Sequence, residues 1–461
     1  MSNRSRRRTV WLAAAGCVLV TVAACGTSTG TGGGTNSSQS SSQSNDSAGG
    51  NTTQGASTGG SGKTLNLTIG QALAMSGDLA DFGPPLAKAD KLAVQQIQAA
   101  LKEIGSDSTV KLVSADTGSS PEIGVQAART VVSKGASCII GDIASSGTLA
   151  IARSVTIPGG ILEISPSSTS DEITKLQSNG LINRTVVANM FEGRALAQII
   201  KEKIGGPKGV TINVGSRNDA GNLSIAENFQ NQWKEWGGTV GKFVTYNPGQ
   251  NSYDAEAGAL VEGNPAGWVI ADFPETFSKF GPALARTGKW DPAKTFTSDA
   301  LASPQLPDSA GKTVTNGMQG LTPGVPEGTD LSTEFSKLYQ SEDPDIKMGS
   351  YVGNAFDATM LCFLSAVAAG STNGTDMAKK IHAVSGPPGK KYTYLQLADA
   401  IKALQAGEDI DYEGVSGAVN LDEHGDPQAG TFDIYTFKDG TMSTVGQISY
   451  NPDAQGGGAT G

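Results

Sequence analysis

Residues Ile139 to Thr169 read IIGDIASSGTLAIARSVTIPGGILEISPSST, and this stretch decides the predicted fold. An apolar run over residues 138–141 leads into a polar loop, and a helical stretch follows over 149–156. A second apolar run over 160–164 then leads into another polar loop. Strand, loop, helix and strand in this order predict a parallel βαβ unit. Both strands then end at the same edge of one sheet, where open α/β sheets bind their ligands.

The two polar loops at this edge carry hydroxyl side chains. They are Ser145, Ser146 and Thr148 in the first loop and Ser167, Ser168 and Thr169 in the second. Neither loop contains a histidine or a cysteine. The pattern therefore indicates a polar binding surface rather than a catalytic centre.

The same alternation of strands and helices extends along the chain. The expected strands are 64–73, 110–115, 209–214, 239–246, 268–271 and 294–297, and the expected helices are 84–104, 123–134, 223–236 and one that ends near 287. The last third breaks this rhythm, with helices expected at 353–369, 376–384 and 394–406 and strands at 414–421 and 431–437. The predicted fold class is α/β, with two doubly wound parallel-sheet lobes.

The chain of 461 residues is acidic, with 34 Lys and Arg against 44 Asp and Glu and a net charge of −10. An acidic chain is a poor partner for nucleic acid, whose phosphates attract basic patches. Only two histidines are present, His382 and His424, which leaves few schemes for a metal site or for acid–base catalysis. The sequence also contains no phosphate-binding loop and no Ser/His/Asp or Cys/His set. We therefore expect no enzyme, no metal and no cofactor.

The N-terminus has the pattern of a targeting segment. Four arginines precede an apolar run over 10–24, which is too short for a stable membrane-spanning helix. The run ends in VAACG at residues 22–26, which resembles a bacterial lipobox and implies that residues 1–24 are removed and that Cys25 carries a lipid. The alternative is an ordinary secretory signal in which Cys25 is incidental. Residues 25–62 then comprise this cysteine and a flexible tether of mostly Gly, Ser, Thr, Asn and Gln, which would hold the body at the outer face of a membrane.

Two cysteines remain in the body of the chain, Cys138 and Cys362. In an oxidising compartment this pair could form a disulfide. The alternative is that both are buried thiols that pack as small hydrophobic side chains.

Eight motifs occur along the chain in the same order as in a known family. They are ALAMSGDLADFG (72–83), ADTGSSPEIGVQAARTVV (115–132), CIIGDIASSGTLA (138–150), ISPSSTSDEIT (164–174), YNPGQNSYDAEAGAL (246–260), FTSDAL (296–301), NAFDATML (354–361) and GVSGAVNLDEHGDP (414–427). Over about residues 64–450 the chain resembles the Leu/Ile/Val-binding proteins, the type I periplasmic solute-binding proteins of ABC importers.

This resemblance implies two lobes joined by three hinge crossings, with the ligand between the lobes. The first lobe would comprise residues 64–185 and 324–418, the second residues 188–320 and 422–450, and residues 451–461 would form a flexible tail. The crossings would lie near residues 184–187, 321–324 and 420–422. Contacts that the ligand makes only in the closed form would hold the lobes together.

In this family, the loops that match residues 144–148 and 167–169 bind the α-carboxylate and the ammonium of an amino acid. By this resemblance the hydroxyl residues of both loops are ligand-binding candidates, with Ser146, Ser168 and Thr169 foremost. Hydroxyl and backbone N–H groups satisfy a carboxylate without a full countercharge. The alternative for Ser168 is a helix N-cap, because two acids and a helical stretch follow it.

Three further positions match the family's site. Phe82 matches an aromatic residue of the side-chain pocket, Phe273 replaces a tyrosine, and Asp299 lies close to the acidic partner of the ammonium. The alternatives are that Phe82 belongs to the core and that Asp299 caps a helix. Ala220 stands where the family usually has an aromatic residue, which favours a bulkier ligand or one other than a branched-chain amino acid.

The expected function is that of an extracytoplasmic solute-binding lipoprotein of an ABC importer, monomeric and anchored at the outer face of the cell membrane. Its partners would be a small polar ligand, such as an amino acid or an amide-like compound, and an ABC permease. The alternative is a ligand-sensing receptor of the same fold that presents its ligand to a membrane signalling protein.

Overall fold

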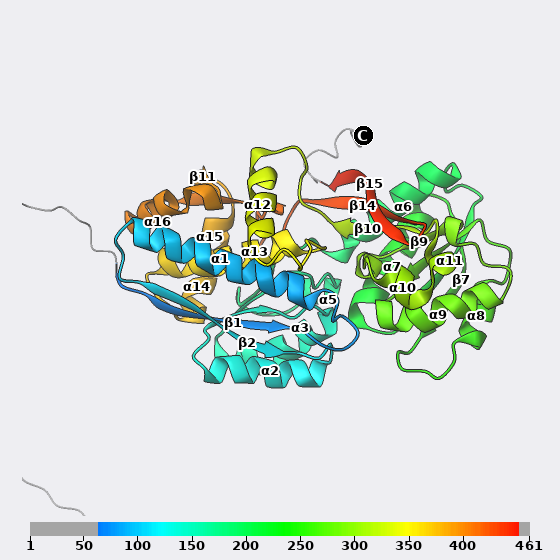
Figure 1. Ribbon diagram of the computed structural model, residues 1–461, viewed down its shortest axis with the longest axis horizontal. Coiled ribbons are helices and arrows are strands. Elements are labelled where there is room, and N and C mark those ends of the chain that lie inside the picture. The colour runs from blue at the N-terminus through cyan, green and yellow to red at the C-terminus, as the bar shows by residue number, and fades with distance from the viewer. Residues whose placement is uncertain (1–62, 451–461) are drawn as a thin grey trace, which may run out of the picture. The chain divides into compact units, whose positions relative to one another are not determined.

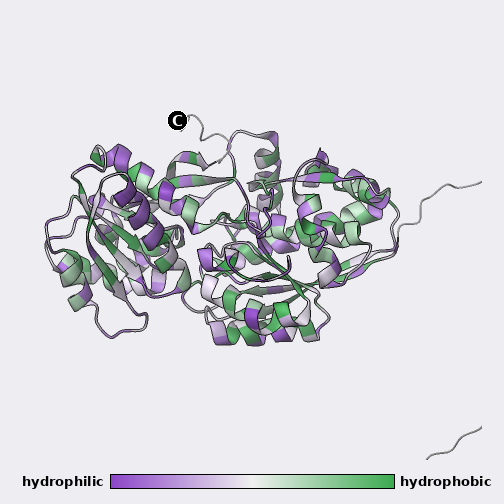
Figure 2. Cartoon of the chain, turned by 180° about the vertical axis from the view of Figure 1, so that it is seen from behind, coloured by the Kyte–Doolittle hydropathy of each residue, from purple (hydrophilic) through white to green (hydrophobic). Residues whose placement is uncertain are grey.

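The computed structural model describes residues 63–450 (Figure 1). The predicted signal peptide, the lipidated Cys25, the tether and the C-terminal tail lie outside these residues. The described chain forms a five-stranded sheet, a seven-stranded sheet and a small three-stranded sheet. Hydrophobic residues are frequent on the strands of the two larger sheets and on the helices that cover them (Figure 2), and buried clusters lie on both faces of each sheet.

The first sheet is parallel throughout and has the strand order β2-β1-β3-β4-β5. Its strands are β1 Asn66–Leu73, β2 Thr109–Asp116, β3 Cys138–Gly141, β4 Leu162–Ser165 and β5 Ile182–Arg184. Helices α1 Gly83–Glu103 and α13 Val352–Ala369 cover one face, and α2 Pro121–Ser133 covers the other. Side chains of β1 alternate between the faces, with Ile69 in the core of α1 and α13 and Ala72 in the core of α2.

The second sheet has the strand order β15-β14-β10-β9-β8-β6-β7. Its parallel strands are β6 Thr211–Arg217, β7 Thr239–Tyr246, β8 Gly267–Ala271, β9 Thr295–Thr297 and β10 Gln319–Pro323, and its antiparallel strands are β14 Gly430–Lys438 and β15 Thr441–Tyr450. Helices α6 Asn189–Ile204 and α7 Ala220–Glu235 pack on one face, and α8 Asp254–Leu260 and α9 Pro274–Arg286 pack on the other.

Short elements complete the described chain. The helices are α3 Ser145–Ile151, η1 Ala152–Thr156, α4 Ile157–Gly159, α5 Asp171–Thr174, η2 Pro292–Lys294, η3 Asp299–Leu301, α10 Leu306–Ala310, α11 Lys312–Thr315, α12 Asp330–Ser341, α14 Gly374–Ala378, α15 Ile381–Ser385, η4 Tyr394–Gln396 and α16 Leu397–Gln405. The third sheet consists of β11 Lys390–Tyr392, β12 Ile410–Gly414 and β13 Gly417–Ala418.

The chain passes three times between the elements that pack on the first sheet and those that pack on the second. The passages follow β5, β10 and β13. Two doubly wound sheets joined by three crossings confirm the predicted fold class. The antiparallel pair β14 and β15 extends one edge of the second sheet.

Three sequence predictions of secondary structure need correction. The helix expected at 149–156 begins earlier, because α3 starts at Ser145 and tertiary packing overrides the weak helix preference of serine and glycine. The helix expected at 376–384 is divided between α14 and α15. The strand expected at 414–421 is interrupted and shortened to β13 Gly417–Ala418, because the fully buried Asp357 carboxylate accepts hydrogen bonds from the backbone N–H groups of Val415 and Ser416 and holds a turn there.

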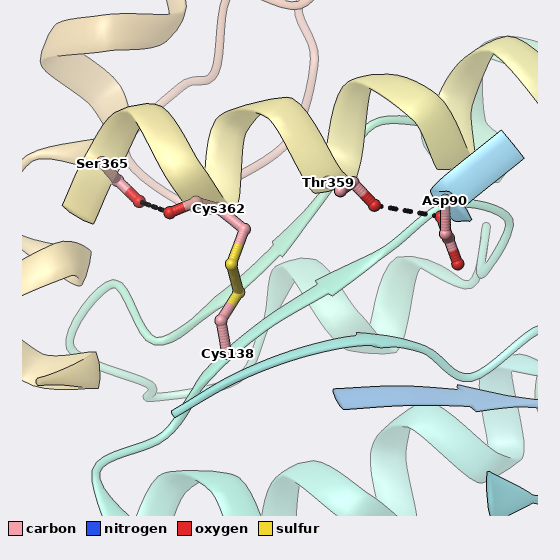
Figure 3. The surroundings of a disulfide bond; sticks show 5 residues. All are labelled: Asp90, Cys138, Thr359, Cys362 and Ser365. Carbon is pink, nitrogen blue, oxygen red and sulfur yellow. Dashed lines mark hydrogen bonds between the residues drawn. A yellow bond between two sulfur atoms is a disulfide. The ribbon is translucent and has the colours of Figure 1, made fainter. Parts of the chain in front are cut away.

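Cys138 and Cys362 form a disulfide between the start of β3 and the middle of α13 (Figure 3). Their Cα atoms lie 6.4 Å apart, and both residues are fully buried. The bond joins positions 224 residues apart in the sequence and fixes the helix to the sheet that it covers. The alternative of two free thiols is therefore wrong.

Helix α13 is apolar enough to cross a membrane by composition alone, with a mean hydropathy of 1.5 over its 18 residues. It is instead a core helix, because 83% of it is buried against other parts of the protein. No other helix in residues 63–450 combines this length and hydropathy.

Stability should fall as the pH rises from 5 to 7.5, in part because Asp90 is a fully buried acid. Its carboxylate accepts hydrogen bonds from Gln71 at 2.7 Å and from Thr359 at 3.1 Å, the second of which is drawn in Figure 3, but burial still raises its pKa to about 7. Between its unfolded and folded pKa values, the folded state binds the extra proton, so each unit of rising pH weakens folding. We expect Asp90 to contribute about 2–3 kcal/mol of this loss.

The measurement is denaturant unfolding of the wild type and of Asp90→Asn at both pH values. The asparagine variant should lose less stability between pH 5 and 7.5, because the group that titrates is gone. Equal pH dependence in the two proteins would contradict the assignment.

Candidate functional site

A cavity lies where the carboxyl ends of strands from the two large sheets face each other. The first sheet and α13 contribute apolar and hydroxyl side chains, and the second sheet contributes Phe273 and Asp299. The cavity has a volume of about 30 Å³, far below the several hundred Å³ of common ligand pockets. A ligand of amino-acid size therefore needs the two sides to move apart before it enters.

The side of the cavity that belongs to the first sheet is uncharged. Ser145 begins α3, and its Oγ accepts the backbone N–H of Ser170 at 3.1 Å, which leaves its O–H free to donate. The Thr169 hydroxyl makes no hydrogen bond to any described residue, although Thr169 is only 6% exposed. The first-turn N–H groups of α3 also lie here, and such groups have no partner within their own helix. These donors together can hold a carboxylate or another acceptor group.

The opposite side carries Asp299, the one charged residue among the described residues that line the cavity. Its Oδ1 accepts the backbone N–H of Ala300 at 2.7 Å, and its Oδ2 accepts the Tyr351 hydroxyl at 2.6 Å. Burial raises the pKa of Asp299, while the hydrogen bonds from Tyr351 and from the Glu192 side chain act in the opposite direction. A buried carboxylate of this kind suits a cationic ligand group, because a buried charge needs a partner.

Aromatic and aliphatic side chains close the space between these two polar ends. Phe82 and Tyr351 pack edge to face with ring centroids 6.0 Å apart. Leu79 and Ile143 lie on the same side, and Phe273 lies across the cavity. The site therefore has hydrogen-bond donors at one end, apolar side chains in the middle and one acid at the other end.

The structure brings together six of the predicted site residues in the cavity lining: Phe82, Ser145, Ser167, Thr169, Phe273 and Asp299. It does not place Ser146, Thr148 or Ser168 in the lining. The Thr148 and Ser168 hydroxyls lie 2.8 Å apart, so that one donates to the other, and both lie within hydrogen-bonding distance of the backbone carbonyl of Asp142. Both residues are fully buried and hold the two loops together rather than facing the cavity. The N-cap of α5 is Ser170, so Ser168 is not a helix cap either.

Sequence reasoning missed Tyr351, Asn222 and Leu79, which also line the cavity. Tyr351 lies in the left-handed region at φ 64° before α13, a conformation that is costly for a side chain of its size. Such a conformation leaves no pattern in the sequence. Ala220 is outside the lining and packs against the core of the first sheet, so it does not leave the extra space expected there.

Polar contacts join the two sides around the cavity. Arg217 at the end of β6 pairs with Asp78 from the loop after β1 at 2.6 Å, and its guanidinium lies 4.4 Å from the Phe273 ring centroid. Ser303 donates to Asp81 at 2.7 Å. With Tyr351 and Asp299, these contacts describe a closed arrangement of the site.

A buried ion pair supports the loop that carries Thr169. Arg184 at the end of β5 donates from Nε and Nη2 to the two Asp426 oxygens at 2.6 and 2.8 Å. Its Nη1 donates to the backbone carbonyls of Ser168 and Ser170. The loop is therefore fixed to two of the passages between the sheets, those after β5 and β13.

Within residues 63–450, no group of three or more His, Cys, Asp and Glu side chains is placed to hold a metal ion. The cavity lining contains no histidine or cysteine.

Comparison with known proteins agrees with this geometry. The sequence pattern of the family described as periplasmic binding protein matches residues 66–429. A chemotactic signal transduction system substrate-binding protein, BasB of Halobacterium salinarum, is 23% identical over 380 residues, which cover 79% of this chain and 85% of that protein.

Solved structures share the fold. The leucine-binding protein LivK of Thermotoga maritima is similar with a TM-score of 0.67 and 21% identity over 84% of this chain and 99% of that one. The branched-chain amino acid transporter substrate-binding protein LivJ of Streptococcus pneumoniae, in complex with isoleucine, is similar with a TM-score of 0.68 and 18% identity over 84% and 100%. With the family pattern matched over most of its length, this chain belongs to the periplasmic binding protein family, with the type I fold.

Proposed function

We propose that the protein is an extracytoplasmic solute-binding lipoprotein of an ABC importer that captures a small zwitterion, an amino acid or a close relative, between its lobes. The observation that carries this proposal is the polarity of the cavity, with uncharged donors at one end and Asp299 as the one charge at the other. A zwitterion presents an anionic and a cationic group at a fixed short distance and fits both ends.

Each end has a defined partner in this proposal. The ligand carboxylate accepts hydrogen bonds from Ser145, Thr169 and the first-turn N–H groups of α3, and the ligand ammonium pairs with Asp299. Phe82 and Phe273 contact the ligand side chain.

Capture in this account is a hinge motion. The lobes, residues 64–185 with 324–418 and residues 188–320 with 422–450, separate to admit the ligand and close around it. Closure restores the interlobe contacts of Arg217 with Asp78 and of Tyr351 with Asp299. Because the ligand contacts both lobes only in the closed arrangement, it shifts the population toward that state.

Cys25 would carry the lipid that keeps the protein at the outer face of the cell membrane, where a permease receives the ligand. A sensory role is the second candidate, because the relative BasB is named as a component of a chemotactic signal transduction system. Both roles use the same capture step and differ in the membrane partner.

The test is a thermal-shift screen of the protein against amino acids, their deaminated analogues, amides and sugars. A ligand present at 100 times its Kd should stabilise the folded state by about 2.7 kcal/mol. We expect a shift with at least one amino acid, no shift with its deaminated analogue, and a smaller shift in Thr169→Val. No shift with any amino acid would contradict the proposed function.

A further inference from the structure

Glu192 is a second buried acid directly behind the ligand site. It lies on α6 and is fully buried, and its Oε1 accepts the backbone N–H of Asp299 at 3.0 Å. Its Oε2 has no hydrogen-bond donor among the described residues. The backbone hydrogen bond places the two acids next to each other, and the charge of Asp299 acts on the pKa of Glu192.

Among residues 63–450, no cationic side chain pairs with either acid. Within residues 63–450, no salt bridge involves either acid, and the other ionisable groups that face the pair are Tyr351 before α13 and Tyr435 on β14. Two buried carboxyl groups in contact cannot both ionise, so one of them keeps a proton.

The hydrogen bonds show which acid keeps that proton. Asp299 accepts from the Ala300 N–H and from the Tyr351 hydroxyl, and both bonds stabilise its ionised form. Glu192 accepts only from the Asp299 N–H, and its second oxygen is unpaired unless it carries a hydrogen that donates to Asp299. Burial and the neighbouring Asp299 charge both raise the pKa of Glu192 well above its usual value.

We propose that Glu192 is a neutral carboxylic acid that positions Asp299 by donating a hydrogen bond to it, so that the ligand site carries a single negative charge. The inference rests on the proposed function of the cavity. It adds a limit on the ligand: the cationic group carries one positive charge, and a second cation finds no partner in the lining.

The pair should exist before the ligand binds. Glu192 on α6 and Asp299 on η3 both belong to elements of the second sheet, so their contact does not depend on closure. Tyr351 comes from the start of α13 on the first sheet and adds its hydrogen bond when the lobes meet. Glu192 therefore sets the charge of Asp299 in the open protein, and Tyr351 reinforces it in the closed one.

The first test needs no ligand. Infrared difference spectra of the protein with ¹³C-labelled glutamate carboxyl groups, wild type minus Glu192→Gln at pH 7, should show the C=O band of a protonated carboxylic acid. Glu163 is also fully buried, but its absorption cancels in the difference spectrum because both proteins contain it. Glu262→Gln, which removes an exposed acid of the same lobe, is the control and should show only the loss of a carboxylate band. A carboxylate band in place of the acid band for Glu192 would overturn the proposal.

The second test uses calorimetric titration with the amino acid that gives the largest shift in the screen, between pH 5 and 9. Glu192→Gln retains an uncharged donor and should keep affinity within about threefold of the wild type. Glu192→Leu lacks the donor, so the pKa of Asp299 should rise, and affinity at pH 7 should fall by up to about tenfold for each unit by which that pKa exceeds 7. The loss should shrink toward pH 9 as Asp299 ionises again.

Two outcomes would overturn the assignment in this second test. Equal losses in the glutamine and leucine variants would mean that Glu192 acts as an anion. A loss in the leucine variant that does not change with pH would mean that Glu192 only fills space. If no amino acid binds the wild type, the proposed function fails, while the infrared test still decides the state of Glu192.

Discussion

Replacing Arg184 with methionine should lower the free energy of unfolding by about 3–5 kcal/mol, because the change leaves a buried carboxylate without its partner. Arg184 is fully buried, and only 7% of the Asp426 side chain is exposed. The guanidinium also donates to the carbonyls of Ser168 and Ser170 at 3.1 and 3.0 Å. Denaturant unfolding at pH 7 measures the effect. Ligand affinity should fall as well, since these carbonyls belong to the loop that carries Thr169.

An exposed ion pair of the same chemistry provides the matched control. Arg286 pairs with Asp254 at 2.6 Å, but their side chains are 61% and 62% exposed. Arg286→Met should therefore cost less than about 1 kcal/mol. If the two methionine variants unfold at the same denaturant concentration, the buried pair does not anchor the binding loop as described.

The second large effect is on binding. Asp299→Asn should weaken the affinity for a zwitterionic ligand by about 30- to 5,000-fold, which corresponds to the 2–5 kcal/mol typical of truncating a buried charge pair. Asparagine has the same shape but no charge, so the ligand ammonium would be left buried without a counterion. Calorimetric titration of wild type and variant with the same amino acid measures the change.

The fold of this variant is checked independently of its affinity. Without ligand, Asp299→Asn should be at least as stable as the wild type at pH 7, because it removes a buried charge that no cation pairs with. Asp308→Asn removes an exposed acid of the same lobe and should leave both stability and affinity unchanged. Unchanged affinity in Asp299→Asn would remove Asp299 from the binding site.

The sequence predicted the parallel architecture well, because central strands such as β3 and β8 are apolar runs and the edge strand β7 is rich in β-branched and aromatic residues. Residues 138–141 form β3 as expected, and residues 239–246 form β7. Strand β15 had no such signal, since most of its residues are exposed or half-buried and show no regular alternation. The turn at Val415 and Ser416 could not be predicted either, because it depends on hydrogen bonds to Asp357, which lies in a helix more than fifty residues earlier.

For the candidate site, the sequence located the two hydroxyl loops but could not tell which hydroxyls face the cavity. Once α3 begins at Ser145, the helical turn places Thr148 against Ser168 instead of in the lining. The sequence could not predict that Tyr351 lines the cavity, because its position depends on one left-handed backbone angle and on closure of the lobes. Glu192 was missed because an acid within an amphipathic helix is usually exposed.

The most direct test of the whole account is a crystal structure of the protein with the amino acid that gives the largest thermal shift. We predict that the ligand lies between the lobes, with its amino group about 3 Å from the Asp299 carboxylate and its carboxylate on the Ser145 and Thr169 hydroxyls. A ligand bound outside this cavity, or bound in it with its amino group away from Asp299, would contradict the account.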